Sequence, residues 1–168
     1  MSEMTRIQGW MHLHSSGISG TCRILTSAGP VLAAKVRRGD TVVTRRGYSS
    51  VVAVREIALP HSASAVRVTQ DALDGRPSSE IILLPSQRIL LRDWRARLYF
   101  GRSIAAPPVV QLVDDEKIVH ANGNGTRFFS IYVGAPEVLI VEGLELASAD
   151  QLHSQSYRAT TDFNHQPI

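Results

Sequence analysis

Short apolar runs separated by turn residues are the feature that most restricts the fold of this chain. They are clearest in Gly20–Arg46, where turns at Ser27–Pro30 and Arg37–Asp40 separate three apolar runs. Apolar runs joined through glycine-containing turns are typical of β-strands. Turn signals recur about every eight to twelve residues, and no long stretch has the 3.6-residue period of a helix. The sequence therefore predicts an all-β fold of many short strands.

Composition and alternation predict where the later strands and turns lie. Segments rich in β-branched or alternating residues predict strands at Tyr48–Ile57, Val66–Thr69, Ile81–Leu84, Arg88–Leu91 and, as the last buried strand, Glu137–Val141. A single helical turn is expected at Val109–Val113. The Asn122–Gly125 turn signal lies between Ile118-Val119 and the strand-like Arg127–Val133, which predicts a hairpin or a looser loop.

The length of 168 residues is typical of one domain with a substantial core. We expect a leader at 1–15, a β-domain at 16–149 and a polar tail at 150–168. No apolar run approaches the roughly 20 residues of a membrane-spanning helix, and residues 1–19 do not resemble a secretory signal. The expected location is cytoplasmic by default, without a membrane partner, although secretion without a cleaved N-terminal signal stays open.

Charge and metal-ligand types give little indication of a cofactor or of nucleic acid. The formal charge is +3, and the arginines are scattered. We interpret them as solvated strand edges and turns that are not interleaved with an exposed aromatic run, so no nucleic-acid partner is expected. His12 and His14 would share one face of a strand, but two histidines without a third ligand are a weak metal site. No cofactor and no metal are predicted.

Cys22 is the only cysteine, which rules out an internal disulfide and argues against a cysteine-based zinc site. A lone cysteine on a strand is usually a small buried hydrophobe. The alternative is a shifted nucleophile, which would need a neighbouring base or cation to lower its pKa.

The order of these motifs resembles the Hint domain, the self-processing module shared by inteins and hedgehog proteins, in its bacterial type found outside inteins. The resemblance is carried by Gly20-Thr21, by Arg37–Thr44 with its order R-x-G-D-x-V-x-T, by Asp74–Pro77 before an apolar run, and by Gln87–Gly101. It spans about residues 16–145 and includes the strand-like Arg127–Val133 and Glu137–Gly143. It implies a flat, horseshoe-like β-domain with its active centre between the two ends.

The same resemblance assigns positions to the site residues. Active relatives begin with cysteine or serine four residues before Gly-Thr, which here is Ser16. That side chain attacks the preceding carbonyl, and a histidine protonates the leaving nitrogen. The histidine positions hold Gln87 and Pro136 in this chain. Glutamine cannot deliver a proton, and general acid catalysis is worth about 10²–10⁴-fold. For Ser16 itself, the alternative is an ordinary hydroxyl in a Ser/Gly-rich loop.

Three functions follow from these observations. The first is a degenerate Hint-like domain that does not cleave itself and acts as a structural or protein-interaction module, holding a partner peptide by strand addition. The second is an active self-processing domain that cuts before Ser16 and releases residues 1–15. The third is a metal or nucleic-acid binder that uses His12, His14 and the arginines. Exposed strand edges also leave a dimer open.

Overall fold

The computed structural model describes residues 16–59 and 63–149. The predicted leader and polar tail, with His12 and His14, lie outside these residues. The described part is mostly β, as predicted, with many short antiparallel strands in two sheets and one short α-helix. No helix in the described residues is long and apolar enough to cross a membrane.

The first sheet has six strands in the order β6-β10-β1-β8-β7-β9. Its strands are β6 (Ala53–Ile57), β10 (Phe128–Tyr132), β1 (Ile18–Ser19), β8 (Ile81–Leu83), β7 (Ser64–Val68) and β9 (Ile118–Asn122). The second sheet has the order β12-β11-β2-β4-β5, with β3 paired to β2. Its strands are β12 (Leu144–Ala147), β11 (Val138–Val141), β2 (Arg23–Thr26), β4 (Thr41–Thr44), β5 (Gly47–Ser50) and β3 (Gly29–Leu32).

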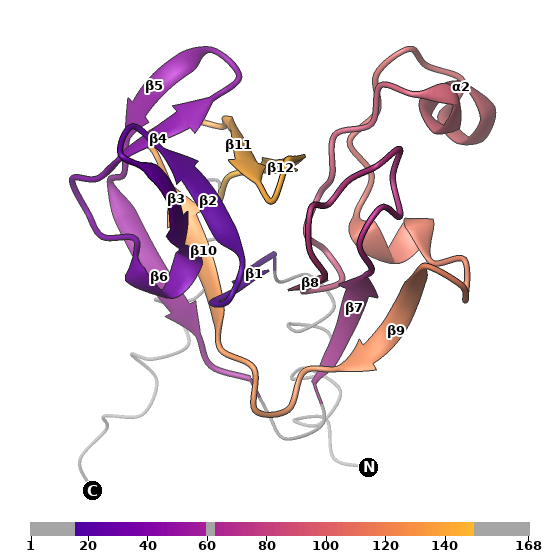
Figure 1. The fold of residues 1–168 in the computed structure, drawn as a ribbon, viewed down its shortest axis with the longest axis horizontal. Coiled ribbons are helices and arrows are strands. Elements are labelled where there is room, and N and C mark those ends of the chain that lie inside the picture. Colours follow the sequence, from indigo (N-terminus) through magenta and orange to yellow (C-terminus); the bar gives the residue numbers. More distant parts are fainter. Residues whose placement is uncertain (1–15, 60–62, 150–168) are drawn as a thin grey trace, which may run out of the picture.

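The molecule has two arms, and the first sheet runs from one to the other, with β1 and β8 between them (Figure 1). Strands β2 to β6 gather in one arm, and β7, β9 and the helix α2 form the other. The pairing of Ile18 with both Phe129 on β10 and Leu83 on β8 joins the arms through a continuous ladder. The short strand β1 is therefore the link between the two halves of the fold.

Two hairpins of the second sheet use the same local turn. In the β2–β3 hairpin the Thr26 hydroxyl donates to the Gly29 carbonyl at 2.7 Å and accepts from the Ala28 N–H at 3.2 Å. In the β4–β5 hairpin the Thr44 hydroxyl donates to the Gly47 carbonyl at 2.9 Å. Gly29 and Gly47 both have positive φ, 100° and 117°, a region that L side chains rarely adopt. The spacing Thr-x-x-Gly therefore determines the position of both turns.

The prediction of one strand over Tyr48–Ile57 is wrong, because the segment crosses from one sheet to the other. Strand β5 pairs with β4, and β6 pairs with β10. Between them the Val51 N–H donates to the Asp40 carbonyl, and the Val52 N–H donates to the Tyr132 carbonyl. The chain changes sheets between Val51 and Val52, because Val51 bonds to the residue before β4 and Val52 bonds to the last residue of β10.

Other boundaries also differ from the prediction. Strands β9 and β10 pair with other strands and not with each other, so the segment after Asn122 is the looser loop, one of the two predicted forms, and not a hairpin turn. The predicted last strand is followed by β12, which pairs with β11. Arg88–Leu91 makes only isolated bridges, to Pro108, Leu146 and Ala105. The run VLAAKV ends in a 3₁₀ helix, Ala33–Lys35, whereas the helical turn predicted at 109–113 is confirmed as a 3₁₀ helix, Val109–Leu112.

Helix α2 (Trp94–Phe100) was not predicted. Asp93 caps its first turn, accepting from the Arg95 N–H at 3.0 Å. Gly101 ends it in the left-handed conformation, at φ 65°. Ala96 is its one fully buried residue, and Phe100, its last residue, is partly buried against the core. The two caps and these two contacts hold a seven-residue helix whose other apolar residues are exposed.

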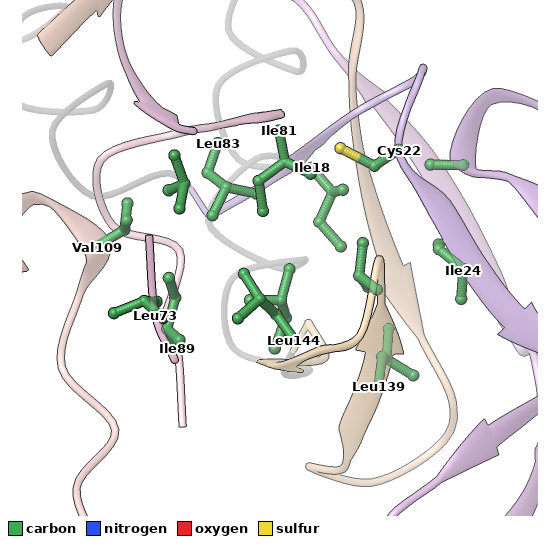
Figure 2. Packing of buried hydrophobic residues seen from close by; sticks show 14 of the residues in the cluster. Ile18, Cys22, Ile24, Leu73, Ile81, Leu83, Ile89, Val109, Leu139 and Leu144 are labelled. Carbon is green, nitrogen blue, oxygen red and sulfur yellow. The ribbon is translucent and has the colours of Figure 1, made fainter. Parts of the chain in front are cut away.

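One continuous apolar cluster fills the space between the sheets (Figure 2). Ile24, Leu139 and Leu146 come from the second sheet, and Ile18 and Leu83 come from the first. All five are almost fully buried. The burial of large aliphatic side chains from both sheets is the main stabilising contribution to the fold.

Candidate functional site

Ser16 lies at the start of the described chain, half-buried and two residues before the first residue of β1. The next residue, Gly17, fixes this approach, because its carbonyl accepts from the Leu84 N–H at 3.0 Å. A Cβ at Gly17 would lie 2.7 Å from Ile57 Cδ1 and 2.9 Å from Leu84 Cδ1. A larger residue at position 17 would have to displace the ends of these two side chains, so glycine allows the close approach without rearrangement.

Gln87 lies in the turn that follows β8, and its side chain is 3% exposed. The side-chain amide Nε2 donates to the Ala147 carbonyl at 2.9 Å and to the Arg88 carbonyl at 3.2 Å. Its backbone carbonyl accepts from the Val109 N–H at 2.8 Å. The Gln87 side chain therefore joins the turn to the end of β12.

The pairing of β1 with β8 brings the segments that carry Ser16 and Gln87 side by side. The Leu84 N–H bonds to Gly17, and the Leu84 carbonyl accepts from the Gln87 N–H at 2.9 Å. No hydrogen bond joins the two side chains within the described part of the chain. The two positions that the sequence predicted as nucleophile and proton donor therefore lie on adjoining segments, and the side chain at position 87 is an amide that contacts carbonyl oxygens.

The histidine that the structure describes lies away from this site. His120 is an exposed residue of β9. In register, Ile18 pairs with Leu83, Leu83 with Val66, and Val66 with His120. Three interstrand spacings place the His120 backbone about 14 Å from β1. His120 is therefore too far from β1 to transfer a proton directly at Ser16.

The second predicted histidine position, Pro136, is exposed in the loop before β11. The residue after it, Glu137, forms an ion pair with Arg46, with 3.8 Å between Arg46 Nη1 and Glu137 Oε1. The Glu137 N–H donates to the Ser148 hydroxyl at 2.9 Å. These contacts hold the start of β11 in place, and neither Pro136 nor Glu137 brings an imidazole to the site.

Cys22 lies in a bend just before β2 rather than on a strand, and it is 2% exposed. Its Sγ is 3.0 Å from the Ser19 hydroxyl. Burial raises the pKa of the thiol, and the Ser19 hydrogen bond only partly offsets this effect. The prediction of a small buried hydrophobe is confirmed, and a raised pKa is the reverse of what a cysteine nucleophile needs.

Within residues 16–59 and 63–149, no group of three or more His, Cys, Asp or Glu residues is arranged to hold a metal ion. The His12 and His14 pair lies outside the described residues. The prediction that the arginines are not interleaved with exposed aromatic residues is wrong for α2. Trp94 and Tyr99 are 52% and 59% exposed there, and Arg97 lies between them in the sequence. The sequence D-W-R-A-R-L-Y-F-G contained the signal, since Asp and Gly can cap a short helix at its two ends.

Comparison with family models matches residues 18–151 to the Hint domain. The chain belongs to the Hint domain family. The match to this family begins two residues after Ser16 and includes Gln87. A comparison with curated proteins gave no match.

Solved structures similar to this Hint domain are inteins. A DnaB intein from Synechocystis sp. PCC 6803 has a TM-score of 0.55 at 12% identity, covering 81% of this chain and 100% of the intein. The AceL NrdHF class 3 split intein has a TM-score of 0.54 at 12% identity, covering 82% of this chain and 100% of the intein. The gp41-1 intein has a TM-score of 0.51 at 15% identity, covering 80% of this chain and 99% of the intein. At these identities the likeness shows the fold, which is intein-like.

Proposed function

We propose that this Hint domain is of the bacterial type found outside inteins, has lost self-cleavage, and acts as a structural or protein-interaction module. The observation that carries the proposal is the Gln87 side chain. Its amide is buried and donates to the carbonyls of Ala147 and Arg88. An amide neither gives up nor accepts a proton near neutral pH. At this position it supports the fold and does not transfer a proton to a leaving nitrogen.

The nucleophile position supports the same conclusion. A serine hydroxyl is a weak nucleophile unless a neighbouring base activates it. Within the described residues Gln87 supplies no base, and the histidine there, His120, lies three strands away. Loss of the general acid costs about 10²–10⁴-fold in rate. An unactivated serine that also lacks this acid would cleave too slowly to serve as a processing device.

The second candidate function is self-processing before Ser16, by transfer of the preceding acyl group from nitrogen to the Ser16 oxygen. It is favoured by the pairing of Gly17 with Leu84, which still sets Ser16 beside the turn that carries Gln87. The scaffold of the reaction is thus retained, and the two functions differ in whether the side chains at these positions still react.

Four full-length proteins separate the two functions: the unmodified chain, Ser16→Cys, Gln87→His, and the double variant. Each is incubated with a thiol, which cleaves the thioester that Ser16→Cys would form, and in parallel with hydroxylamine, which also cleaves an ester at Ser16, and its mass is followed over time. We expect no cleavage of the unmodified chain and none of Ser16→Cys, because the better nucleophile still lacks a proton donor. Cleavage before position 16 is expected only in the double variant. Release of residues 1–15 from the unmodified chain, or from Ser16→Cys alone, would contradict the proposal.

The edge strand β9 is the surface that we assign to partner binding. It pairs with β7 on one side and ends the sheet on the other. Its sequence, IVHAN, contains neither a charge nor a proline, the residues that usually block strand addition at an edge. By contrast, the opposite edge strand β6 carries Arg55 and Glu56. An extended peptide added to β9 would gain main-chain hydrogen bonds.

Site-specific photo-crosslinking tests this edge in the cells that produce the chain. A photoreactive residue replaces Val119 on β9 in one variant, and Ala28, an exposed turn residue of the other arm, in the control. We expect a discrete adduct from position 119 that is absent from position 28. Equal labelling from both positions, or none from position 119, would remove β9 as the binding edge.

A further inference from the structure

Helix α2 carries a compact apolar surface that the fold does not use. Trp94, Leu98 and Tyr99 are 52%, 68% and 59% exposed. Trp94 and Leu98 are four residues apart and share one helix face. The Trp94 and Tyr99 rings pack edge to face, with centroids 5.9 Å apart. We call these three residues the α2 patch. Contact between its two rings keeps the patch together as a unit.

The helix that carries the α2 patch is held at both ends and by the core. Asp93 caps the helix start, Gly101 ends it, and Ala96 anchors it in the core. Figure 1 shows α2 at the far end of its arm, projecting away from both sheets. A projecting helix is convex, so its occupant has to deform around it or already carry a matching hollow.

The charge around the α2 patch is positive. Residues 88–104 contain five arginines and one aspartate, and with the neighbouring Asp74 and Glu145 the difference between arginines and carboxylates is 5 − 3, or +2. The nearby carboxylates are already paired, since Asp93 and Asp74 bind Arg95, and Glu145 binds Arg92. Arg97 and Arg102 are exposed and form no ion pair within the described part of the chain. They leave the patch with unbalanced positive charge.

We propose that the α2 patch inserts into the surface of a membrane that contains anionic lipid. Tryptophan and tyrosine favour the boundary between headgroups and acyl chains, and an aliphatic side chain such as Leu98 enters the apolar layer. Arginines beside them attract anionic headgroups. The lack of a spanning helix in the described residues does not bear on such binding, because an interfacial helix lies on the membrane. The inference is independent of whether the domain cleaves itself.

Other occupants fit the α2 patch less well. A second copy of the chain would bring Arg97 and Arg102 of both copies together, which is unfavourable. Single-stranded nucleic acid needs free aromatic faces for stacking. The Arg95 guanidinium lies over the Trp94 ring, 4.7 Å from its centroid, and Leu98, the most exposed of the three, offers no ring. A lipid surface deforms around a convex group and needs no matching hollow.

The test is co-sedimentation of the full-length chain with vesicles of phosphatidylcholine alone, or with about 30 mol% phosphatidylserine as the anionic component. We expect binding to the anionic vesicles that weakens with added salt. Leu98→Ser should weaken it roughly tenfold, since one leucine leaves the apolar layer. Arg97→Gln with Arg102→Gln should weaken it roughly thirtyfold, because two arginines no longer attract the headgroups.

Matched controls lie on the other arm. Tyr48→Ser removes a side chain that is 73% exposed, and Arg37→Gln with Arg38→Gln removes two exposed turn arginines. Both should bind like the unmodified chain. In a Trp10→Phe background the fluorescence of Trp94 should shift to shorter wavelength with anionic vesicles, which reports insertion of the ring itself.

Several results would overturn the proposal. They are absence of vesicle binding, equal binding to neutral and anionic vesicles, and unchanged binding by Leu98→Ser. Retention of an oligodeoxynucleotide that depends on Leu98 would assign the α2 patch to nucleic acid instead. A dimer that Leu98→Ser dissociates would assign it to a second copy of the chain.

Discussion

Replacing Gln87 with glutamate tests whether this side chain supports the fold. Gln87→Glu keeps the shape of the side chain and exchanges an amide donor for a carboxylate. At neutral pH that carboxylate would face the carbonyl oxygens of Ala147 and Arg88, at the positions where Nε2 now donates over 2.9 and 3.2 Å. The two donated bonds disappear, and a buried charge faces two acceptors. We expect the free energy of unfolding to fall by about 3–5 kcal/mol.

The same substitution has a pH signature with a definite sign. Burial and the facing carbonyls disfavour the charged form, so the introduced carboxyl holds its proton more tightly in the folded state than in the unfolded state. The penalty is therefore smallest below the unfolded value of about 4.3 and grows as pH rises above it. Once protonated, the group has one O–H and can restore one hydrogen bond, which limits the cost to about 1–2 kcal/mol.

Urea unfolding at pH about 4 and about 7 measures this difference by linear extrapolation. Gln87→Met is the control, since it also removes both hydrogen bonds but introduces no charge, and its penalty should not depend on pH. A Gln87→Glu penalty below about 1 kcal/mol at both pH values would refute the structural role that the hydrogen bonds imply. So would equal penalties at the two pH values.

Three further predictions concern other buried or bonded groups. Because burial raises the pKa of Cys22, its thiol should react with iodoacetamide slowly in the native protein and rapidly in denaturant. The free energy of unfolding should fall as the pH rises above 9.0, the ordinary pKa of a thiol. Partial burial opposes ionisation of Asp114, but N–H donors from the residues that follow it outweigh this effect and lower its pKa below 3.8. The free energy of unfolding should therefore fall as the pH drops below 3.8, and an NMR titration of the Asp114 carboxyl should show the low pKa. Glu142 accepts from the Arg23 N–H and the Ser78 hydroxyl, both at 2.9 Å, so Glu142→Ala should cost about 1–2 kcal/mol in urea unfolding, and an unchanged midpoint would contradict this clamp.

The strand runs were predictable because their signals are local. Apolar alternation and turn residues mark most of the short strands, and the turn that contains Gly29 lies where it was predicted. The second Thr-x-x-Gly turn, at Thr44–Gly47, was not predicted. Strand pairing was not predictable in the same way. The break between β5 and β6 depends on Val51 bonding to Asp40 and Val52 bonding to Tyr132, bonds between residues far apart in sequence for which the valine-rich run gives no sign.

The candidate site was predictable in its positions but not in its contacts. The resemblance to Hint domains aligned Ser16 and Gln87, and the pairing of β1 with β8 brings their segments together. Nothing in the local sequence indicated that Gln87 would reach Ala147, because this bond joins residues 60 positions apart. The exposed face of α2 was missed because a seven-residue helix is too short to show a period, and only its caps mark it.

The most direct test of the central claim is the intact mass of the freshly purified full-length chain, repeated after long incubation with a thiol or with hydroxylamine. Hydroxylamine cleaves the ester that an acyl shift to Ser16 would form. The account predicts a single species with the mass of residues 1–168 at every time point. Accumulation of a species that begins at Ser16, absent from Ser16→Ala, would show that the chemistry survives without a histidine at position 87 and would contradict the account.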